Sequence, residues 1–314
     1  VLVHGYHAGF EHEPSRTLIK RVERLIEQYQ KPVACVIFAE ALEKDYLKKS
    51  VKIPIFSAPE NAMRAFNLSY KWPFRKPSPL QVQALDRVNR EKAQEAVARG
   101  EKTGRLLLHE SLQLLEHYGF SVPAYALVKT EAEALQFRRT SKGPIAMKIN
   151  SPHFSHKSDL GGVQLNIKTQ AEAEKAFRKL AALGGDETEV LVQTMVTRGR
   201  EVILGGKRDQ SFGPIVLFGL GGIFVEALKD VVWRVAPLSY EEARRMIASI
   251  RGARVLQGIR GEKPCDIETV VDLLVKLSHM LVYLPQIQEI DINPVVVFAE
   301  GQGAVAVDAR VIVS

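Results

Sequence analysis

The chain contains 314 residues, of which 25% are charged, and its 43 basic and 36 acidic side chains give a formal net charge of +7. This composition predicts two or three globular domains and excludes a largely disordered chain. There is no apolar run of membrane-spanning length, no signal peptide and no basic stripe interleaved with aromatic residues. We therefore expect a cytoplasmic protein without membrane or nucleic-acid partners. The basic excess fits an anionic ligand or simply a basic surface.

The first 73 residues predict alternating helices and strands. Residues 17–29 have helical spacing of apolar side chains, and residues 31–39 form an apolar run of the kind that is buried in a parallel sheet. Residues 53–72 add a short strand and a helix that begins at Ser57 or Pro59. This order indicates an α/β layer architecture, but the segment is too short to be a complete doubly wound domain.

Residues 74–103 are predicted to be a linker. The linker begins with a proline-containing stretch that favours extended backbone, and it continues as a charged helix that is mostly solvated and ends at Gly100. Beyond the linker, residues 106–120 predict an amphipathic helix that ends at Gly119. Capping boxes mark the starts of three later helices, at Thr130 with Glu133, Thr169 with Glu172 and Ser239 with Glu242.

Strands are predicted to alternate with these later helices. They cover residues 123–128, 143–149, 163–167, 189–196, 201–209 and 213–219, and the chain ends in a two-stranded hairpin within residues 292–313. This mixture predicts two α+β subdomains that hold a ligand between them, with a division near residue 190.

The segment at residues 144–164 carries the strongest functional signal. An apolar strand brings Lys148 to its end, and a polar loop with His153, His156, Lys157 and Asp159 leads to Gly161 and Gly162 at the start of the next strand. Such a loop offers backbone N–H groups, an ammonium and an imidazole to one small volume. These groups are what a polyphosphate needs, so we expect a polyphosphate site here.

The chain from about Gly104 to its end resembles the ATP-grasp domain of NDP-forming acyl-CoA synthetases, the family of ADP-forming acetyl-CoA synthetase. The matching stretches are residues 148–163, 191–239, 260–268, 289–297 and 305–313, in the order of the family. The resemblance implies an α/β and α+β chain. Residues 1–73 would be the C-terminal part of a flavodoxin-like ligase domain, residues 74–103 the linker, and residues 104–314 an ATP-grasp domain of two subdomains.

The same resemblance implies a nucleotide site. It places the adenine hinge at Gln193, Thr194, Met195 and Val196, and Glu201 near the ribose or a phosphate-bound cation. With the loop described above, the predicted nucleotide-binding residues are Lys148, Ser155, Lys157, Gly161, Gly162, Gln193, Thr194, Met195, Val196 and Glu201. His156 is either a second phosphorylated histidine that relays the phosphoryl group or a side chain that only binds phosphate.

Magnesium ligands are predicted in the C-terminal hairpin. Asp291 and Asn293 are two residues apart and so lie on one face of a strand, and Asp308 lies in the partner strand. Asp291 is also a catalytic candidate. The run of Gly219, Gly221 and Gly222 does not complete a dinucleotide fingerprint, because Phe224 occupies its last position. A phosphate-facing turn is the better interpretation, with Glu226 and Arg234 facing the site. Arg234 either stabilises charge on a transferred phosphoryl group or forms a salt bridge.

The function implied by the resemblance is the ATP/ADP- and Mg²⁺-binding portion of an acyl-CoA synthetase. In that family the reversible reaction is acyl-CoA plus ADP and phosphate giving carboxylate, ATP and CoA, through phosphohistidine. CoA-binding and ligase domains or subunits are the implied partners, in a homo- or hetero-oligomer, and the chain alone is expected not to turn over. Two alternatives remain open, a regulatory module of a protein acetyltransferase and another ATP-grasp carboxylate ligase. Neither the acyl group nor a preference for ATP over GTP can be predicted from the sequence.

Overall fold

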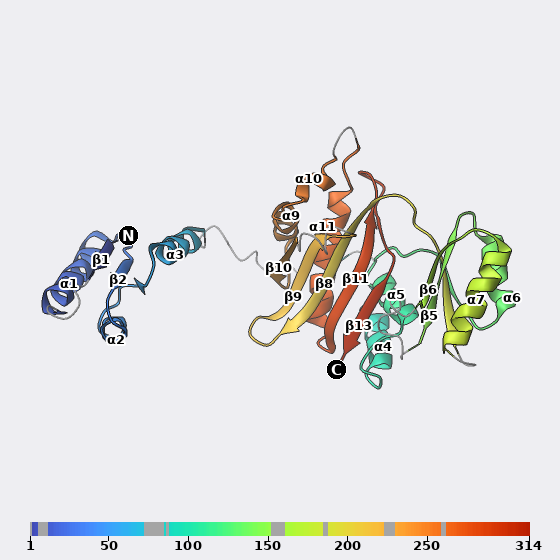
Figure 1. Cartoon of the computed structure of the whole chain (residues 1–314), viewed down its shortest axis with the longest axis horizontal. Coiled ribbons are helices and arrows are strands. Elements are labelled where there is room, and N and C mark those ends of the chain that lie inside the picture. The colour runs from blue at the N-terminus through green and yellow to red at the C-terminus, as the bar shows by residue number, and fades with distance from the viewer. Residues whose placement is uncertain are drawn as a thin grey trace. The chain divides into compact units, whose positions relative to one another are not determined.

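The computed structural model describes residues 2–5, 12–71, 85, 88–151, 161–184, 188–222, 230–258 and 262–314. The chain divides into two compact units, Val1–Pro79 and Leu80–Ser314, which are drawn from blue to red in Figure 1. Each unit has its own core, so each is described separately. None of the helices in the described part of the chain is both long and apolar enough to cross a membrane.

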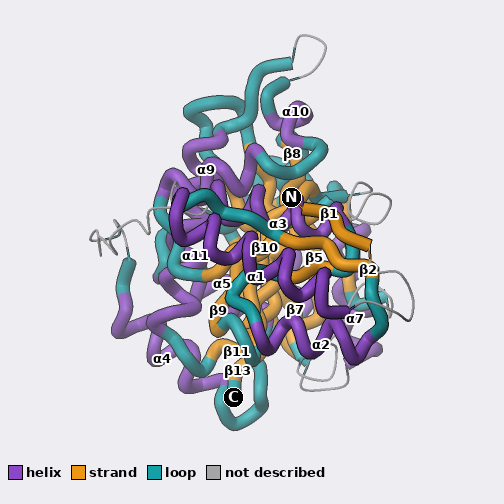
Figure 2. Tube along the Cα trace, turned by 90° about the vertical axis from the view of Figure 1, so that its left-hand side faces the viewer, coloured by secondary structure: helices purple, strands orange, loops and turns teal. Residues whose placement is uncertain are grey.

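The N-terminal unit is a three-stranded parallel sheet with helices on both faces. Its strands lie in the order β1-β2-β3, and Figure 2 shows β1 and β2 side by side. Ile19, Ile37 and Leu47 share one core cluster, so the first two helices cover one face of the sheet, and Val36 packs with Ala62 of the third helix. The elements are β1 (Leu2–Gly5), α1 (His12–Tyr29), β2 (Cys35–Phe38), α2 (Ala41–Ser50), β3 (Ile55–Phe56) and α3 (Pro59–Lys71).

The predicted elements of the N-terminal unit are confirmed, but two further elements, β1 and α2, were not predicted. The helix begins earlier than predicted, at His12, and the next strand is shorter than its apolar run. The second predicted helix is α3, which begins at Pro59, one of the two predicted starts. The sequence analysis missed α2, whose N-cap residue Glu40 makes no side-chain capping hydrogen bond and therefore leaves no capping signal.

Two helices precede the sheets of the C-terminal unit. They are α4 (Arg90–Gly100) and α5 (Leu108–His117). The charged helix α4 is mostly exposed, as predicted, but it buries a stripe of Ala93, Ala96 and Val97 in the large core. Helix α5 packs in two directions, because Leu114 and Leu115 belong to that core while Leu108 and Leu112 pack against Leu191 of the smaller sheet.

The smaller sheet has four antiparallel strands in the order β4-β7-β5-β6. Helices α6 and α7 cover one of its faces, as Figure 1 shows, and the capping boxes predicted at their starts are present. Side chains such as Met147 and Val192 point into the core beneath these helices. The elements are β4 (Tyr125–Val128), α6 (Glu131–Thr140), β5 (Ile145–Asn150), β6 (Val163–Ile167), α7 (Gln170–Gly184) and β7 (Glu189–Thr194).

The larger sheet has six strands in the order β10-β9-β8-β11-β12, with β13 also paired to β11. Its first strand in the sequence begins at Arg200, and the last strand of the smaller sheet ends at Thr194. The chain therefore passes from one sheet to the other between these residues, a few residues after the predicted division. The C-terminal hairpin and the capping box at Ser239 are confirmed. The elements are β8 (Arg200–Asp209), β9 (Gly213–Leu220), β10 (Val231–Val235), α9 (Tyr240–Ala248), α10 (Ala253–Leu256), α11 (Ile267–Tyr283), β11 (Ile287–Val297), β12 (Ala304–Ala306) and β13 (Ala309–Val313).

The two faces of the larger sheet differ. Helix α11 packs against β8 and β9 and lies behind these strands in Figure 1. A Cβ on Gly206 would lie 2.3 Å from Leu281 Cδ1, so a larger residue at this position would force the Leu281 side chain to move. Strand register and alternation assign the side chains to a face. Phe218, Leu204, Ile292 and Ala309 form a buried row under the helices, and Trp233, Leu217, Gly205, Asp291 and Arg310 form a row on the opposite face.

Candidate functional site

Strand β5 places Lys148 between the two sheets. Its neighbours Met147 and Ile149 are both fully buried, and Met147 packs in the core under α6 and α7. Because side chains alternate along a strand, Lys148 lies on the other face of β5. Its ammonium donates to Asp308 Oδ2 at 2.6 Å and to the carbonyl oxygen of Val307 at 3.2 Å. Lys148 is only 4% exposed, so this is a buried contact and not a surface lysine at the end of a strand.

Gln193 of β7 reaches the same place. It pairs with Ala146 across the β5–β7 ladder, which puts its side chain on the face that carries Lys148. Gln193 Nε2 donates to the Val307 carbonyl oxygen at 3.3 Å. Its Oε1 is buried and has no partner among the described residues. Because a buried amide oxygen without a hydrogen bond is costly, this atom is an acceptor that a bound donor could satisfy.

The predicted metal ligands lie in the middle of β11, where Asp291 and Asn293 are placed, and between β12 and β13, where Asp308 is placed. The Asn293 N–H donates to the Asp308 carbonyl oxygen at 3.2 Å, which brings the two residues side by side. Burial raises the pKa of Asp291; Arg310 opposes this shift, and the nearby charges of Glu289 and Asp308 reinforce it. The set thus contains two carboxylates and one amide oxygen, which are ligand types that Mg²⁺ accepts. The described residues contain no group of three or more His, Cys, Asp or Glu side chains that could hold a metal.

Glu201 lies on the open face of the larger sheet. It is exposed and has the same strand parity as Gly205, which is paired with Asp291. The glycine turn after β9 packs directly on it, because Gly221 donates its N–H to the Glu201 carbonyl oxygen at 2.7 Å. A Cβ on Gly221 would lie 2.7 Å from Glu201 Cβ, so this turn requires a residue without a side chain.

Arg234 lies on the opposite face of the sheet from Asp291. It pairs with Val216, which belongs to the core under the helices, whereas the adjacent Trp233 lies in the Asp291 row. The Arg234 guanidinium donates to the Trp233 carbonyl oxygen at 2.8 Å and to Ser249 Oγ, at the end of α9, at 3.4 Å. Within the described residues, Arg234 therefore does not share a face with Asp291, whereas Glu226, the other residue predicted beside it, lies outside them.

The last residue of β7 and the residue that follows it have their backbone donors in use. The Thr194 N–H donates to the Ala124 carbonyl oxygen at 2.9 Å, and the Met195 N–H donates to that of Pro144 at 3.0 Å. The Val196 N–H has no backbone acceptor within the described ranges. This group is therefore a main-chain donor that the segment can offer to a ligand.

The glycine pair after the polar loop is placed, but the loop is not described. Gly162 accepts a hydrogen bond from the Ile149 N–H at 2.9 Å, so the pair Gly161 and Gly162 lies next to the end of β5. Ser155, His156 and Lys157 fall outside the described residues, as does Glu226.

The sequence analysis missed one polar contact beside Lys148. Asn150 is 4% exposed and lies two residues beyond Lys148 on the same face of β5. Its side chain contacts the His109 ring, with Nδ2 at 3.0 Å from Nδ1, and its Oδ1 accepts from the His109 N–H at 3.4 Å. The two-residue spacing of Lys148 and Asn150 could have predicted that they share a face of the strand. No local pattern could have predicted the contact with His109, because His109 is distant in sequence.

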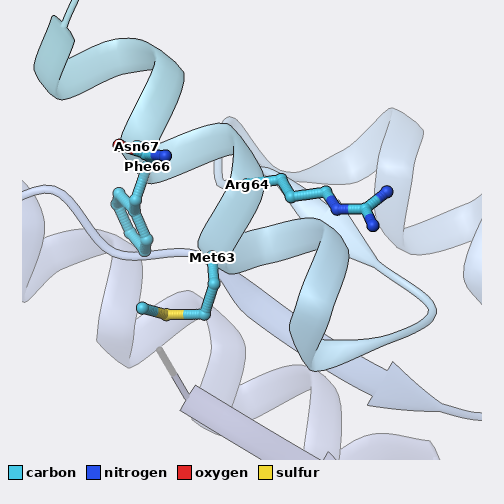
Figure 3. A pocket seen from close by; sticks show the side chains of 4 residues that line it. All are labelled: Met63, Arg64, Phe66 and Asn67. Atoms are coloured by element: carbon cyan, nitrogen blue, oxygen red, sulfur yellow. The ribbon is translucent and has the colours of Figure 1, made fainter. Parts of the chain in front are cut away.

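A hollow in the N-terminal unit is chemically different from this site. It has a volume of about 530 Å³ and is lined by Met63, Arg64, Phe66 and Asn67 of α3. Figure 3 shows Met63 and Phe66 pointing to one side of the helix and Arg64 extending away from them. None of the residues predicted for nucleotide or metal binding lines it.

Comparisons with known proteins agree with the geometry of the C-terminal unit. A family model described as an ATP-grasp domain matches residues 97–313. The chain is 45% identical over 235 residues to the β subunit of ADP-forming acetate–CoA ligase I from Pyrococcus furiosus, with 73% of this chain and 100% of the subunit covered. It is 38% identical over 282 residues to ADP-forming acetate–CoA ligase I from Archaeoglobus fulgidus. This match covers 87% of this chain but only 41% of the length of that relative.

A solved structure adds nucleotide complexes to this comparison. The dinucleotide forming acetyl-coenzyme A synthetase 1 of Ca. Korarchaeum cryptofilum was solved with coenzyme A and Mg-AMPPCP, with its phosphohistidine segment pointing towards the nucleotide binding site. It matches this chain with a TM-score of 0.62 and 37% identity, over 71% of this chain and 100% of that chain. On the family model and the β subunit covered over its whole length, this chain belongs to the ATP-grasp family, among the ADP-forming acetate–CoA ligases.

Proposed function

We propose that the chain binds a magnesium complex of ATP or ADP between its two sheets and exchanges a phosphoryl group between this nucleotide and a histidine. The whole reaction would be the reversible conversion of acyl-CoA, ADP and phosphate into carboxylate, ATP and CoA. The observation that carries the proposal is the convergence of buried Lys148 and Gln193 with Asp291, Asn293 and Asp308 at one place. A cation, an unsatisfied acceptor and a set of oxygen ligands suit the phosphates, the base and the metal of one ligand.

The base is assigned to the end of β7. Gln193 Oε1 would accept a hydrogen bond from the exocyclic amino group of adenine, and the Val196 N–H would donate to a ring nitrogen. Guanine presents a carbonyl oxygen where adenine has its amino group, so the same Oε1 would remain unsatisfied and repelled. We therefore propose adenine nucleotides as the ligand class. Glu201, on the open face, would accept from ribose hydroxyls or face a phosphate-bound cation.

The phosphates are assigned to Lys148 and to the backbone beside Gly161 and Gly162. The ammonium would neutralise phosphate charge, and the glycine backbone would let phosphate oxygens approach closely. Asp291, Asn293 and Asp308 would hold Mg²⁺, which when bound neutralises charge on the phosphate oxygens. Ser155 and Lys157 would complete the phosphate site from the loop.

The phosphoryl acceptor is assigned to histidine. A neutral imidazole nitrogen would attack the terminal phosphorus while the bond to the bridging oxygen of ADP breaks. His156 would relay the group, or it would bind phosphate while a histidine of a partner domain accepts the group and becomes phosphohistidine. The phosphohistidine segment of the Korarchaeum protein, which points towards its nucleotide site, supports an acceptor supplied from outside this chain. The partner would then be a CoA-binding domain or subunit.

The test uses ATP labelled in its terminal phosphate. The chain is incubated with labelled Mg·ATP, alone and with the CoA-binding subunit of a related ligase, and acid-labile, base-stable label is measured. We expect phosphohistidine on the partner, and its formation should depend on His156 if that residue relays the group. Survival of the label in His156→Ala would leave His156 as a phosphate-binding residue. Absence of label in every mixture would contradict the proposed function.

A second experiment tests the assignment of the base. Calorimetric titrations should show that Mg·ADP binds at least about tenfold more tightly than Mg·GDP, since a site built to pair a donor rejects an acceptor strongly. Gln193→Leu should reduce this preference, and Leu191→Met serves as a control for a change on the same strand. Equal affinities for both nucleotides in the parent chain would remove Gln193 from base recognition.

A further inference from the structure

Lys148 and Asp308 neutralise each other in the structure. Lys148 Nζ lies 2.6 Å from Asp308 Oδ2, and the two side chains are 5% and 31% exposed. These are the side chains assigned above to the phosphates and to the metal. Each therefore has a counter-ion in place before any ligand binds, and a bound phosphate needs the same ammonium that Asp308 holds.

The ion pair is supported by its surroundings. Lys148 belongs to the four-stranded sheet, and Asp308 lies between β12 and β13 of the other sheet. The Val307 carbonyl oxygen accepts from both Lys148 and Gln193, so three side-chain contacts from the smaller sheet meet this two-residue segment. A buried ammonium requires such a partner, because an unpaired charge away from water is costly.

We propose that Asp308 competes with the nucleotide phosphates for Lys148, and that Mg²⁺ relieves this competition by binding Asp308. This inference rests on the proposed function and adds a coupling between its two ligands. Nucleotide without metal must separate the ion pair, leave Asp308 without a counter-ion and add phosphate charge near Asp291. With Mg²⁺, the pair is exchanged for a metal–carboxylate contact and an ammonium–phosphate contact, so no charge is left unpaired.

The coupling is reciprocal by thermodynamic necessity. If Mg²⁺ raises the affinity for nucleotide by freeing Lys148, nucleotide raises the affinity for Mg²⁺ by the same factor. The structure therefore predicts that the ion pair suppresses binding of metal-free nucleotide. Removing the charge of Asp308 should raise affinity for metal-free nucleotide, although the same substitution removes a proposed metal ligand.

The experiment measures ADP binding to the full chain by calorimetry in the presence of EDTA. Asp308→Asn keeps the size of the side chain and an acceptor for Lys148, and it removes only the charge. We expect this variant to bind metal-free ADP about tenfold more tightly than the parent, and to gain less affinity than the parent when Mg²⁺ is added. Circular dichroism and a thermal melt confirm that the variant is folded.

Two further variants isolate the ion pair. Glu289→Gln removes the same charge from the open face of β11, where Glu289 pairs with Arg310 at 3.5 Å, and it should leave metal-free ADP binding unchanged. The gain from Asp308→Asn should disappear when Lys148 is also replaced by Gln, since the gain acts through that ammonium. An equal gain in Glu289→Gln would show a general charge effect and overturn the proposal.

The outcomes separate this inference from the proposed function. If the parent binds Mg·ADP but Asp308→Asn binds metal-free ADP no more tightly than the parent, the exchange is wrong and the nucleotide site stands. If the parent binds no nucleotide with or without Mg²⁺, both are overturned.

Discussion

The two sheets of the C-terminal unit contribute chemically opposite groups to one place. The smaller sheet supplies a cation and an amide, Lys148 and Gln193, whereas the larger sheet and its hairpin supply the carboxylates of Asp291 and Asp308. The smaller sheet is thus suited to an anion and a base, and the larger one to a metal ion. Neither sheet alone could bind a metal–nucleotide complex, so function depends on what holds the two sheets together.

Helix α5 provides the apolar part of that connection. Leu112 is fully buried against Leu191 of the smaller sheet, while Leu114 and Leu115 pack into the core of the larger one. The polar part is the Lys148–Asp308 pair. We therefore expect a cavity under α5 to destabilise the fold, and the loss of the Lys148 charge to weaken the ligand site.

The largest effect is expected from Leu112→Ala. This substitution leaves a cavity between α5 and the smaller sheet, and large-to-small changes in cores cost about 2–5 kcal/mol of unfolding free energy. Denaturant unfolding of the C-terminal unit measures the loss. Leu165→Ala is the matched control, because Leu165 is 61% exposed and its truncation should change stability by less than about 0.5 kcal/mol. Similar losses in both variants would contradict the role of α5.

The next effect is expected from Lys148→Met. It removes the phosphate-facing charge, and a lost charge-assisted hydrogen bond costs about 1.5–3 kcal/mol of binding free energy, or roughly ten- to hundredfold in affinity. Calorimetry with Mg·ADP measures the change. Lys207→Met is the control, since this lysine lies 5.3 Å from the centre of the Trp233 ring on the larger sheet. Unchanged affinity in Lys148→Met would remove this residue from the site.

A pH effect on stability is expected from His279 in helix α11. Burial, together with the charge of Arg90, lowers the pKa of His279 below its ordinary value of 6.5. Below about pH 6.5 the unfolded chain therefore binds a proton at His279 more readily than the folded chain does. The free energy of unfolding should fall as the pH drops below this value. Melting curves between pH 8 and pH 5 measure the loss.

His279→Gln separates this contribution from that of other groups. The pKa of His117 is also lowered, mainly by burial, and this residue remains in both proteins. The difference between the parent and His279→Gln therefore reports His279 alone, and the variant should lose less stability on acidification. Parallel curves for the two proteins would show that His279 does not contribute.

The smallest effect is expected from Arg234→Gln. Since Arg234 faces α9 and not the Asp291 row, Mg·ADP affinity should change by less than about twofold, as for surface substitutions away from a site. Calorimetry under the conditions used for Lys148→Met makes the two directly comparable. A loss as large as that of Lys148→Met would place the guanidinium at the phosphates after all.

These residues also show what sequence can predict. The alternation of strands and the hairpin follow from local patterns, so the place of Lys148 in β5 and the adjacent positions of Asn293 and Asp308 could be anticipated. The contact between Lys148 and Asp308 joins residues 160 apart in the chain, so no local pattern encodes it. The matching stretches of the family identified the residues, but their mutual contact required the structure.

The face of the sheet on which a side chain lies was the second feature that the sequence did not predict. The sequence analysis treated Arg234 as part of a turn, and only the bounds and register of β10 show that Trp233 and Arg234 point to opposite faces. Helix α11 was missed for a related reason. Its buried side chains run around most of its surface, so it has no amphipathic stripe to mark it. Burial on both sides arises from tertiary packing, which the sequence does not display.

The most direct test of the account is the metal dependence of ADP binding to the parent chain. Calorimetric titrations are made at one pH with Mg²⁺ and with EDTA. We expect one site in Mg²⁺ and at least about tenfold weaker binding in EDTA, because Lys148 is then held by Asp308. Equal affinity under both conditions, or no binding in Mg²⁺, would contradict a metal–nucleotide site between the two sheets.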